Sequence, residues 1–344
     1  MPNPTISVCL PNLNTARYLP ERFDSILAQT FTDWECVVSD NYSDDGAWQI
    51  IQNYAARHPR IKVEQARRDP QGMYPNWNNC LRRARGTFIY IATSDDTMAP
   101  ECLAKLHDAL GRYPDCGLAF CALQKIDEQG KAIPDDCSGW PPVGYFGPLM
   151  KQRHIRPAMH DSLIAAALGT PYLSMTQLLF RRSLLASTGL FEAQWGSAGD
   201  LAWQMRATLF ASTVYIPEAL ATWRIHGEQA SSGRVLQEAK LSGMFVAMTD
   251  EFLKFSREQG LPPPSGWPSR VRRYRVGEMI EAIWNFHGGK SSPRSLLDQM
   301  RHEPAGVAAF LLGKLYRRLG LRTSNHRLLA GDLRRAGVKG PFVV

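Results

Sequence analysis

Residues 87–96, TFIYIATSDD, are the stretch that decides the fold. Thr87–Ala92 is a short, continuous run of apolar, aromatic and β-branched residues, and it leads directly into Ser94, Asp95 and Asp96. A short apolar run bounded by polar residues is typical of a strand that is buried on both faces of a sheet. The sequence therefore predicts a buried strand with two neighbouring carboxylates at its carboxyl end.

The same pattern occurs twice earlier in the chain. The apolar runs Thr5–Leu10 and Trp34–Ser39 lead into the polar segments Pro11–Asn14 and Asp40–Gly46. Helical periodicity separates the predicted strands and continues after them, at residues 17–29, 47–56, 76–84 and 100–111, and further strands are predicted at 61–65 and 117–123. This alternation predicts an α/β fold with a mostly parallel sheet flanked by helices. Ligands of such sheets bind beyond the carboxyl ends of the strands, where the three polar segments would converge.

Several classes of protein are excluded by what the sequence lacks. No G-x-G-x-x-G follows the first predicted strand and no G-x-x-x-x-G-K-[ST] occurs, which disfavours dinucleotide and P-loop phosphate binding. The longest uncharged run, Ser162–Phe180, is interrupted by Gly169 and Pro171, so it predicts a buried helix and strand and no membrane span. The seven Cys form no C-x-x-C pair, which indicates buried thiols in a reducing, cytoplasmic compartment.

The positive charge is concentrated at the C-terminal end. Of the net +8, residues 265–344 carry 15 Lys and Arg against five Asp and Glu, or +10, which leaves −2 for residues 1–264. A basic tail favours nucleic acid, an anionic membrane surface or an acidic partner, although a solvated helical face gives the same composition. Leucines and basic residues alternate between 311 and 322, a pattern compatible with a basic amphipathic helix. No nucleic-acid motif accompanies the charge, so no nucleic-acid partner is expected.

The carboxylates at the strand ends admit two interpretations. Asp95 and Asp96 could cap the following helix, or they could hold a divalent cation, since Mg²⁺ is commonly bound by one or two carboxylates together with phosphate oxygens. Asp40 is open to the same alternatives. Asp200, at the start of a predicted helix, either complements the helix dipole or acts as a general base. His226, in Trp223-Arg224-Ile225-His226-Gly227, is either structural or part of an anion-binding loop.

The order of these segments resembles glycosyltransferase family 2. The resemblance covers residues 5–232 and rests on SVCLPNLN at 7–14, SILAQTFTDWE at 25–35, VVSDNYSDDG at 37–46, GMYPNWN at 72–78, ARG at 84–86, SDD at 94–96, GLF at 189–191, GD at 199–200 and WRIH at 223–226. It implies a GT-A fold, with residues 1–232 as the glycosyltransferase domain. The resemblance does not cover residues 233–344, whose charge and periodicity predict a basic helical C-terminal region. The resemblance also implies an inverting transfer from a nucleotide-diphosphate sugar to a hydroxyl of a glycan or lipid-linked acceptor.

The resemblance assigns roles on the nucleotide side of the site. It implies that Pro11, Asn12 and Asn14 line the nucleotide pocket. Asp40 would hydrogen-bond the base, which in this family is most often uracil. Asn76 would lie along the floor of the donor site.

On the reacting side, the resemblance implies that Asp95 approaches the ribose or the sugar. Asp96 would bind Mg²⁺ or Mn²⁺ on the diphosphate, and His226 would contact the metal or the diphosphate. Asp200 would be the base that takes the proton of the acceptor hydroxyl. The sequence departs from the family pattern at Ser94, where the first Asp of D-x-D is usual, and at Gly199, where an acidic residue often precedes the base.

Two alternatives stay open at the level of sequence. A sugar nucleotidyltransferase has a related fold, but it would show a Gly-rich, basic loop after the first strand. A nucleotide-sugar or glycan-binding module without activity is disfavoured by the joint presence of Asp40, Asp96, Asp200 and His226. The basic C-terminal region suggests peripheral contact with an anionic membrane near lipid-linked acceptors.

Overall fold

The computed structural model describes residues 3–66, 72–134, 137, 140–227, 238–267, 274, 304, 308, 311 and 325–344. In these residues nine strands form one sheet in the order β3-β2-β1-β4-β7-β5-β8-β6-β9. The strands are β1 (Ile6–Asn12), β2 (Trp34–Asp40), β3 (Ile61–Gln65), β4 (Phe88–Ile91), β5 (Cys116–Ile126), β6 (His154–Arg156), β7 (Leu178–Arg181), β8 (Ser212–Arg224) and β9 (Phe342–Val343). The main helices are α1 (Leu19–Leu27), α2 (Ala47–Arg57), α3 (Tyr74–Arg83), α4 (Cys102–Arg112), α5 (Pro141–Phe146), α6 (His160–Leu168), α7 (Leu184–Thr188), α8 (Gly199–Phe210), α9 (Glu238–Glu258) and α13 (Asn325–Arg335).

The sheet is mostly parallel, as the sequence predicts. β3, β2, β1 and β4 pair in parallel, and β5 pairs in parallel with β8. Among the described strands, only β7 and β6 run against the rest, because each pairs antiparallel with both of its neighbours. The predicted α/β class is therefore confirmed, with the reversed strands confined to the part of the sheet beyond β4.

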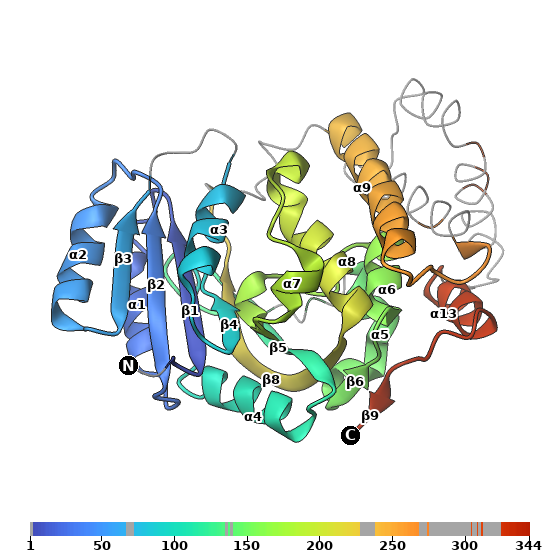
Figure 1. Ribbon diagram of the computed structural model, residues 1–344, viewed down its shortest axis with the longest axis horizontal. Coiled ribbons are helices and arrows are strands. Elements are labelled where there is room, and N and C mark those ends of the chain that lie inside the picture. The colour runs from blue at the N-terminus through green and yellow to red at the C-terminus, as the bar shows by residue number, and fades with distance from the viewer. Residues whose placement is uncertain are drawn as a thin grey trace.

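Helices cover both faces of the sheet (Figure 1). Successive side chains of a strand point to opposite faces. In β1, Val8 therefore packs with Phe23 of α1 and Leu106 of α4, whereas Cys9 packs on the other face with Trp77 of α3 and Trp203 of α8. Burial on both faces explains why the strands read as continuous apolar runs.

The strand register brings two of the predicted site residues together. In the β1–β2 pair, Asn12 is the partner of Asp40, the last residue of each strand. Both strands extend further than the sequence pattern suggests, since Pro11 and Asn12 belong to β1 and Asp40 belongs to β2. Pro11 has no N–H to donate to a neighbouring strand. This costs no hydrogen bond on the β4 side, because β4 pairs with β1 only as far as Cys9.

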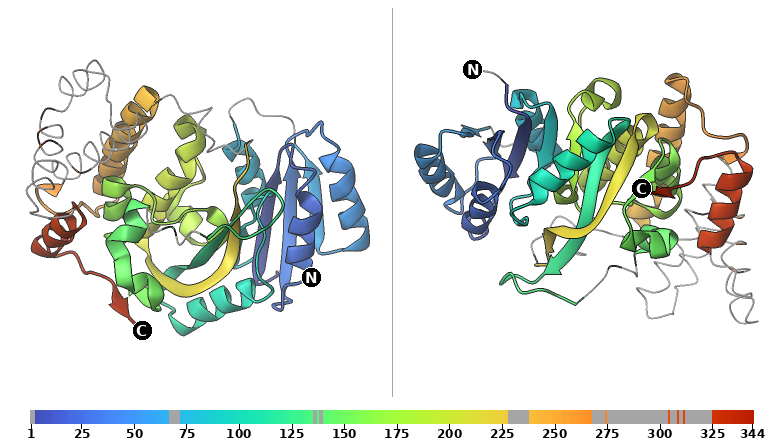
Figure 2. Two further views of the ribbon diagram at one scale, coloured as in Figure 1. Left: turned by 180° about the vertical axis from the view of Figure 1, so that it is seen from behind. Right: turned by 90° about the horizontal axis from the view of Figure 1, so that it is seen from below.

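The C-terminal helices pack against the body. Met248 and Phe252 of α9 and Leu333 of α13 share a hydrophobic cluster with Leu163 of α6 and Leu209 of α8. The chain then returns to the sheet, where β9 pairs with β6 at the edge opposite β3 (Figure 2). Helix α9 lies within residues 233–344, which are predicted to be helical.

Two predictions for this region lie outside the described residues. They are the boundary near residue 232 and, apart from Leu311, the basic stretch up to residue 322. In the described segments there is no helix with the length and apolarity needed to cross a membrane. The seven Cys are all buried and none of them forms a disulfide, which confirms their prediction as buried thiols.

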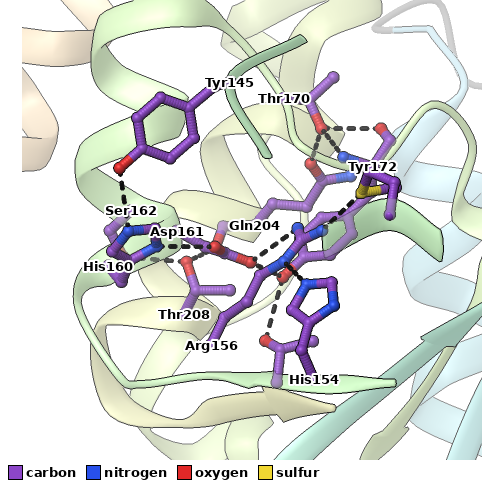
Figure 3. Close-up of polar contacts among 12 residues, drawn as sticks. Tyr145, His154, Arg156, His160, Asp161, Ser162, Thr170, Tyr172, Gln204 and Thr208 are labelled. Atoms are coloured by element: carbon purple, nitrogen blue, oxygen red, sulfur yellow. Dashed lines mark hydrogen bonds and ion pairs between the residues drawn. The ribbon is translucent and has the colours of Figure 1, made fainter. Parts of the chain in front are cut away.

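A buried polar network joins α6 to the far half of the sheet (Figure 3). Arg156 Nη1 lies 3.4 Å from Asp161 Oδ2, and the two side chains are 0% and 1% exposed. Tyr172 donates its hydroxyl to the same carboxylate at 2.7 Å, and Arg156 Nε donates to His154 Nε2 at 3.0 Å. Burial, and next the Arg156 charge, lower the pKa of His154 to about 4. The network is enclosed and holds an uncharged imidazole, so we assign it a structural role.

Candidate active site

The ends of β1 and β2 are joined by a side-chain network around Asp40. Asn12 Nδ2 donates to Asp40 Oδ1 at 2.7 Å, and Ser43 contributes both its backbone N–H, at 3.1 Å to Oδ2, and its hydroxyl, at 2.6 Å to Oδ1. Gln65 Nε2, at the end of β3, completes the set at 3.2 Å from Oδ2. A carboxylate has about four lone-pair sites, so neighbours fill the acceptor capacity of Asp40 in this structure.

Asn14 fastens the outer part of the same two loops. Its backbone N–H donates to the Ser43 hydroxyl at 2.9 Å, and its side-chain oxygen accepts the N–H of Asp44 at 3.0 Å. Asn14 and Tyr42 both have positive φ, 52° and 54°, a conformation that costs little for Asn and more for Tyr. The loops after β1 and β2 therefore form one unit at the carboxyl edge of the sheet.

Asn76 connects this unit to α3. Its side-chain N–H₂ donates to the carbonyl oxygens of Asn12, at 3.1 Å, and Ser39, at 3.0 Å. Its Oδ1 is buried and has no hydrogen-bond partner among the described residues. A buried acceptor without a donor is costly, so this oxygen is a candidate to receive one from a ligand. A pocket of about 520 Å³ adjoins it, lined among others by Asn41, Gln65, Ala66, Asn76, Asn79 and Phe191.

Asp95 and Asp96 follow β4 at the same edge. Asp96 is 2% exposed, and its Oδ1 accepts the backbone N–H of Arg224, the last residue of β8, at 2.8 Å. Its Oδ2 accepts the hydroxyls of Thr93 and, at 3.4 Å, of Ser174. Burial, and next the negative charge of Asp95, raise the pKa of Asp96 to about 7. The charge of Asp95 therefore opposes ionisation of the buried Asp96, and a cation would relieve this.

Arg224 clamps the Asp95–Asp96 loop from β8. Its Nε donates to the carbonyl of Asp95 at 2.7 Å, and its other nitrogens reach the carbonyls of Asp127 and Glu128 and the carboxylate of Glu21. Because the guanidinium is 1% exposed, these bonds are sheltered from water. The loop that carries the carboxylates is thus held by the last residue of β8.

His226 lies directly beside Asp95. Its Nε2 is 3.1 Å from Asp95 Oδ2, and its ring packs 5.0 Å from that of Tyr18. The described residues contain no group of three or more His, Cys, Asp and Glu side chains arranged to hold a metal ion. Nevertheless, two adjacent carboxylates and an imidazole are a donor set that fits Mg²⁺ or Mn²⁺ when phosphate oxygens and water complete the shell.

Asp200 begins α8 and is held by its surroundings. Its Oδ1 accepts the N–H of Leu201 at 2.8 Å and lies 3.2 Å from the hydroxyl of Tyr74. Burial raises the pKa of the Asp200 carboxyl, and the hydrogen bonds from Leu201, Tyr74 and its own backbone oppose this rise only in part. A carboxylate with a raised pKa is better matched to proton transfer near neutrality.

The structure therefore joins the predicted residues into three groups. Asn12, Asn14, Asp40 and Asn76 form one network, Asp96 is joined to Asp95 and His226 in a second, and Asp200 lies with Tyr74 in a third. Sequence reasoning gave no role to Ser43, Gln65 or Tyr74. Ser43 and Tyr74 lie inside the motifs that carry the resemblance, and this position is the signal that could have marked them as site residues. Gln65 lies outside these motifs.

Comparison with solved structures identifies the class of fold. The chain matches residues 1–349 of TarS from S. aureus, solved in complex with UDP-GlcNAc, with a TM-score of 0.60 and 19% identity over 93% of each chain. It also matches the mannosyltransferase PcManGT from Pyrobaculum calidifontis, solved with GDP-Man and Mn²⁺, with a TM-score of 0.52 and 19% identity over 98% of this chain and 87% of that one. The fold is that of the GT-A glycosyltransferases.

The family follows from the sequence match. The model of glycosyl transferase family 2 matches residues 7–185, which is more than half of the chain, and the chain belongs to this family. Chondroitin synthase from Escherichia coli is 26% identical over 156 residues, which cover 45% of this chain and 21% of the synthase. The chain likewise spans less than half the length of two other curated relatives.

Proposed function

We propose that this protein is a metal-dependent, inverting glycosyltransferase. It would move a sugar from a UDP-sugar to a hydroxyl of a glycan or lipid-linked acceptor. The observation that carries the proposal is the placement of acids at the ends of different elements: Asp40 is the last residue of β2, Asp96 follows β4 next to Asp95 and its partner His226, and Asp200 begins α8. These groups offer a nucleotide pocket, a cation site and a base, which are the parts that displacement of a nucleoside diphosphate needs.

The nucleotide would bind against the β1–β2 loops and α3. In this proposal an N–H of the base or a hydroxyl of the ribose donates to Asn76 Oδ1, which is buried and has no donor among the described residues. Asp40 can accept a hydrogen bond from the nucleotide base only if one of its four present donors moves away. Gln65 makes the longest of the four bonds, at 3.2 Å, and is the residue we expect to move. TarS is solved with UDP-GlcNAc and PcManGT with GDP-Man, so the identity of the base requires a direct test.

Asp96 and His226 would hold the cation, with Asp95 directed toward the ribose or the sugar. When bound, Mg²⁺ or Mn²⁺ would neutralise the charge that develops on the departing diphosphate. The chain's own contribution is to hold the loop still. The backbone N–H of Arg224 fixes the Asp96 carboxylate, and the guanidinium fixes the Asp95 carbonyl. The Asp96 carboxylate and the backbone of Asp95 would therefore be positioned before the donor arrives.

Asp200 would take the proton of the acceptor hydroxyl. The hydrogen bonds that its carboxylate receives from Leu201 and Tyr74 both go to Oδ1, so Oδ2 is the oxygen that would accept that proton. A single carboxylate that acts as a base leads to one direct displacement at the anomeric carbon, and therefore to inversion. We infer no covalent sugar–enzyme intermediate.

The test combines nucleotide binding with turnover. UDP with Mn²⁺ should raise the melting temperature of the protein, whereas ATP or NAD should not, and a panel of nucleotide sugars should reveal the donor through release of the nucleoside diphosphate. Asp200→Asn should abolish transfer while UDP binding persists, and Asp108→Asn, on the exposed side of α4, should leave both unchanged. Near-normal turnover by Asp200→Asn would refute the base assignment. Release of pyrophosphate from UTP and a sugar 1-phosphate, without release of UDP from any nucleotide sugar, would indicate a nucleotidyltransferase.

The basic C-terminal region adds a second, separable part to the proposal. Its net +10 would attract the enzyme to an anionic membrane, where lipid-linked acceptors lie. Co-sedimentation with vesicles that contain anionic lipid should occur at low salt and weaken at high salt. The absence of binding at low salt would reject this part alone. We expect no salt-sensitive binding to oligonucleotides.

A further inference from the structure

Tyr74 contacts the proposed base from a distant part of the chain. Its hydroxyl lies 3.2 Å from Asp200 Oδ1 and 3.0 Å from the carbonyl oxygen of Ser197, and it accepts the backbone N–H of Asp200 at 2.9 Å. One phenol therefore contacts both the side chain and the backbone of the base. It also holds the segment that leads into α8.

The ring of Tyr74 is fixed by its packing. Tyr74 is 1% exposed, stacks against Phe191 at a centroid distance of 5.7 Å, and meets Trp77 edge-on at 5.2 Å. Burial, and next the nearby Asp200 charge, keep the pKa of Tyr74 well above its usual value. The hydroxyl thus keeps its proton, for which Asp200 Oδ1 and the Ser197 carbonyl oxygen are both acceptors, and an ionised carboxylate is the stronger of the two.

Gly199 makes room for this arrangement. A Cβ at residue 199 would lie 2.5 Å from Cε2 of Tyr74 and 2.6 Å from the carbonyl oxygen of Glu192. Contacts this short with a packed ring and with backbone force something to shift, so the ring can occupy its place only beside a glycine. The glycine before Asp200 and the tyrosine 125 positions earlier are therefore two parts of one arrangement.

Tyr74 also lies close in the chain to the donor pocket. It is the first residue of α3, and Asn76, two residues later in the same turn, lines the pocket and binds the carbonyls of Asn12 and Ser39. A displacement of this turn would move both Tyr74 beside the base and Asn76 beside the donor pocket. The first turn of α3 therefore connects the nucleotide side of the site to the base.

We propose that Tyr74 is a positioning residue for Asp200. It holds Oδ1, so that Oδ2 faces the acceptor hydroxyl, and it stabilises the ionised form of the carboxylate that must take the proton. This inference rests on the proposed function, in which Asp200 is the base. In this inference the hydroxyl of Tyr74 supports the base, and Gly199 leaves the room that the Tyr74 ring needs.

The test is Tyr74→Phe, which removes the hydroxyl and keeps the ring. Loss of a hydrogen bond to a charged group should lower kcat about 10- to 100-fold. KM for the donor should stay within about twofold, because the donor does not touch the phenol. The acid limb of the kcat profile should move to higher pH, since the carboxylate loses a donor that favours its charged form.

Tyr215→Phe is the matched control, because Tyr215 is also buried and its hydroxyl donates to the Met150 carbonyl at 3.1 Å. This variant should keep the wild-type pH profile. An unchanged kcat in Tyr74→Phe, or a lower kcat without movement of the acid limb, would overturn the inference. Asp200→Asn separates the two levels: if it stays active, the proposed base is wrong, whereas if it is inactive and Tyr74→Phe behaves as wild type, only the role of Tyr74 is wrong.

Discussion

Removal of one partner from the buried Arg156–Asp161 pair gives the sharpest test of the fold. Asp161→Asn keeps the shape of the side chain and an acceptor for the Tyr172 hydroxyl, but it leaves the Arg156 cation buried without its counter-charge. Breaking a buried ion pair in this way typically costs about 3–5 kcal/mol. The guanidinium also lies 3.4 Å from the ring centroid of Phe146 and 4.4 Å from that of Phe120, and such contacts retain part of the stabilisation. We therefore expect about 3 kcal/mol.

The assay is urea unfolding followed by far-UV circular dichroism. A loss of this size is a large part of the about 5–15 kcal/mol that stabilises a typical protein, so the transition should move clearly to lower urea. Arg156→Met combined with Asp161→Asn should cost less than the sum of the single changes, because no uncompensated charge remains.

The control is the exposed pair Lys254–Glu258, in which the side chains are 71% and 57% exposed. Glu258→Gln should change stability by less than about 0.5 kcal/mol. A loss below about 1 kcal/mol for Asp161→Asn would mean that water or a rearrangement reaches Arg156, and the reasoning from burial would fail.

Three further predictions concern pH, packing and the Arg224 clamp. The pKa of His154 is lowered to about 4, so as pH falls from about 6.5 toward 4 the unfolded chain takes up a proton that the folded chain does not. The free energy of unfolding should therefore fall by up to about 1.4 kcal/mol per pH unit. Urea unfolding at pH 7 and pH 5 should show that His154→Asn removes this part of the loss. Gly199→Ala should cost about 1–3 kcal/mol by thermal denaturation, whereas Gly111→Ala, where a Cβ meets nothing within 4 Å, should cost nothing; equal effects would contradict the packing argument. Arg224→Lys keeps the positive charge but loses the several hydrogen bonds that the guanidinium makes to the Asp95 carbonyl and its neighbours. Metal-dependent UDP binding, measured by calorimetry, should therefore weaken about tenfold or more. Unchanged affinity would show that these bonds are dispensable.

Much of the fold could be predicted from the sequence because the signals are local. A strand buried on both faces is apolar along most of its length, as Phe88–Ile91 and, apart from Ser7, Ile6–Leu10 are, and the polar residues that follow mark where it ends. The reversed direction of β7 and β6 had no local signal, since a strand of three or four residues reads the same in either direction. The position of the strand ends was also imprecise, and Pro11, Asn12 and Asp40 proved to lie within strands.

The candidate site shows the same division. The motifs predicted which residues gather at the carboxyl edge, and the register of β1 on β2 brings Asn12 and Asp40 together as a parallel pair requires. The occupied acceptor sites of Asp40 could not be predicted, because Gln65 reaches it from the next strand along the sheet.

The sequence by itself determined the class of fold, the strand ends that carry acids and the membership of the family, because these depend on apolar periodicity and on short motifs within a few residues of each other. Only the tertiary structure decided which groups support the acids. Asp96 receives the N–H of Arg224 from 128 residues away, and Asp200 receives the hydroxyl of Tyr74 from 126 residues away. Hydrogen bonds act over about 3 Å, so such partners exist only once the chain has folded.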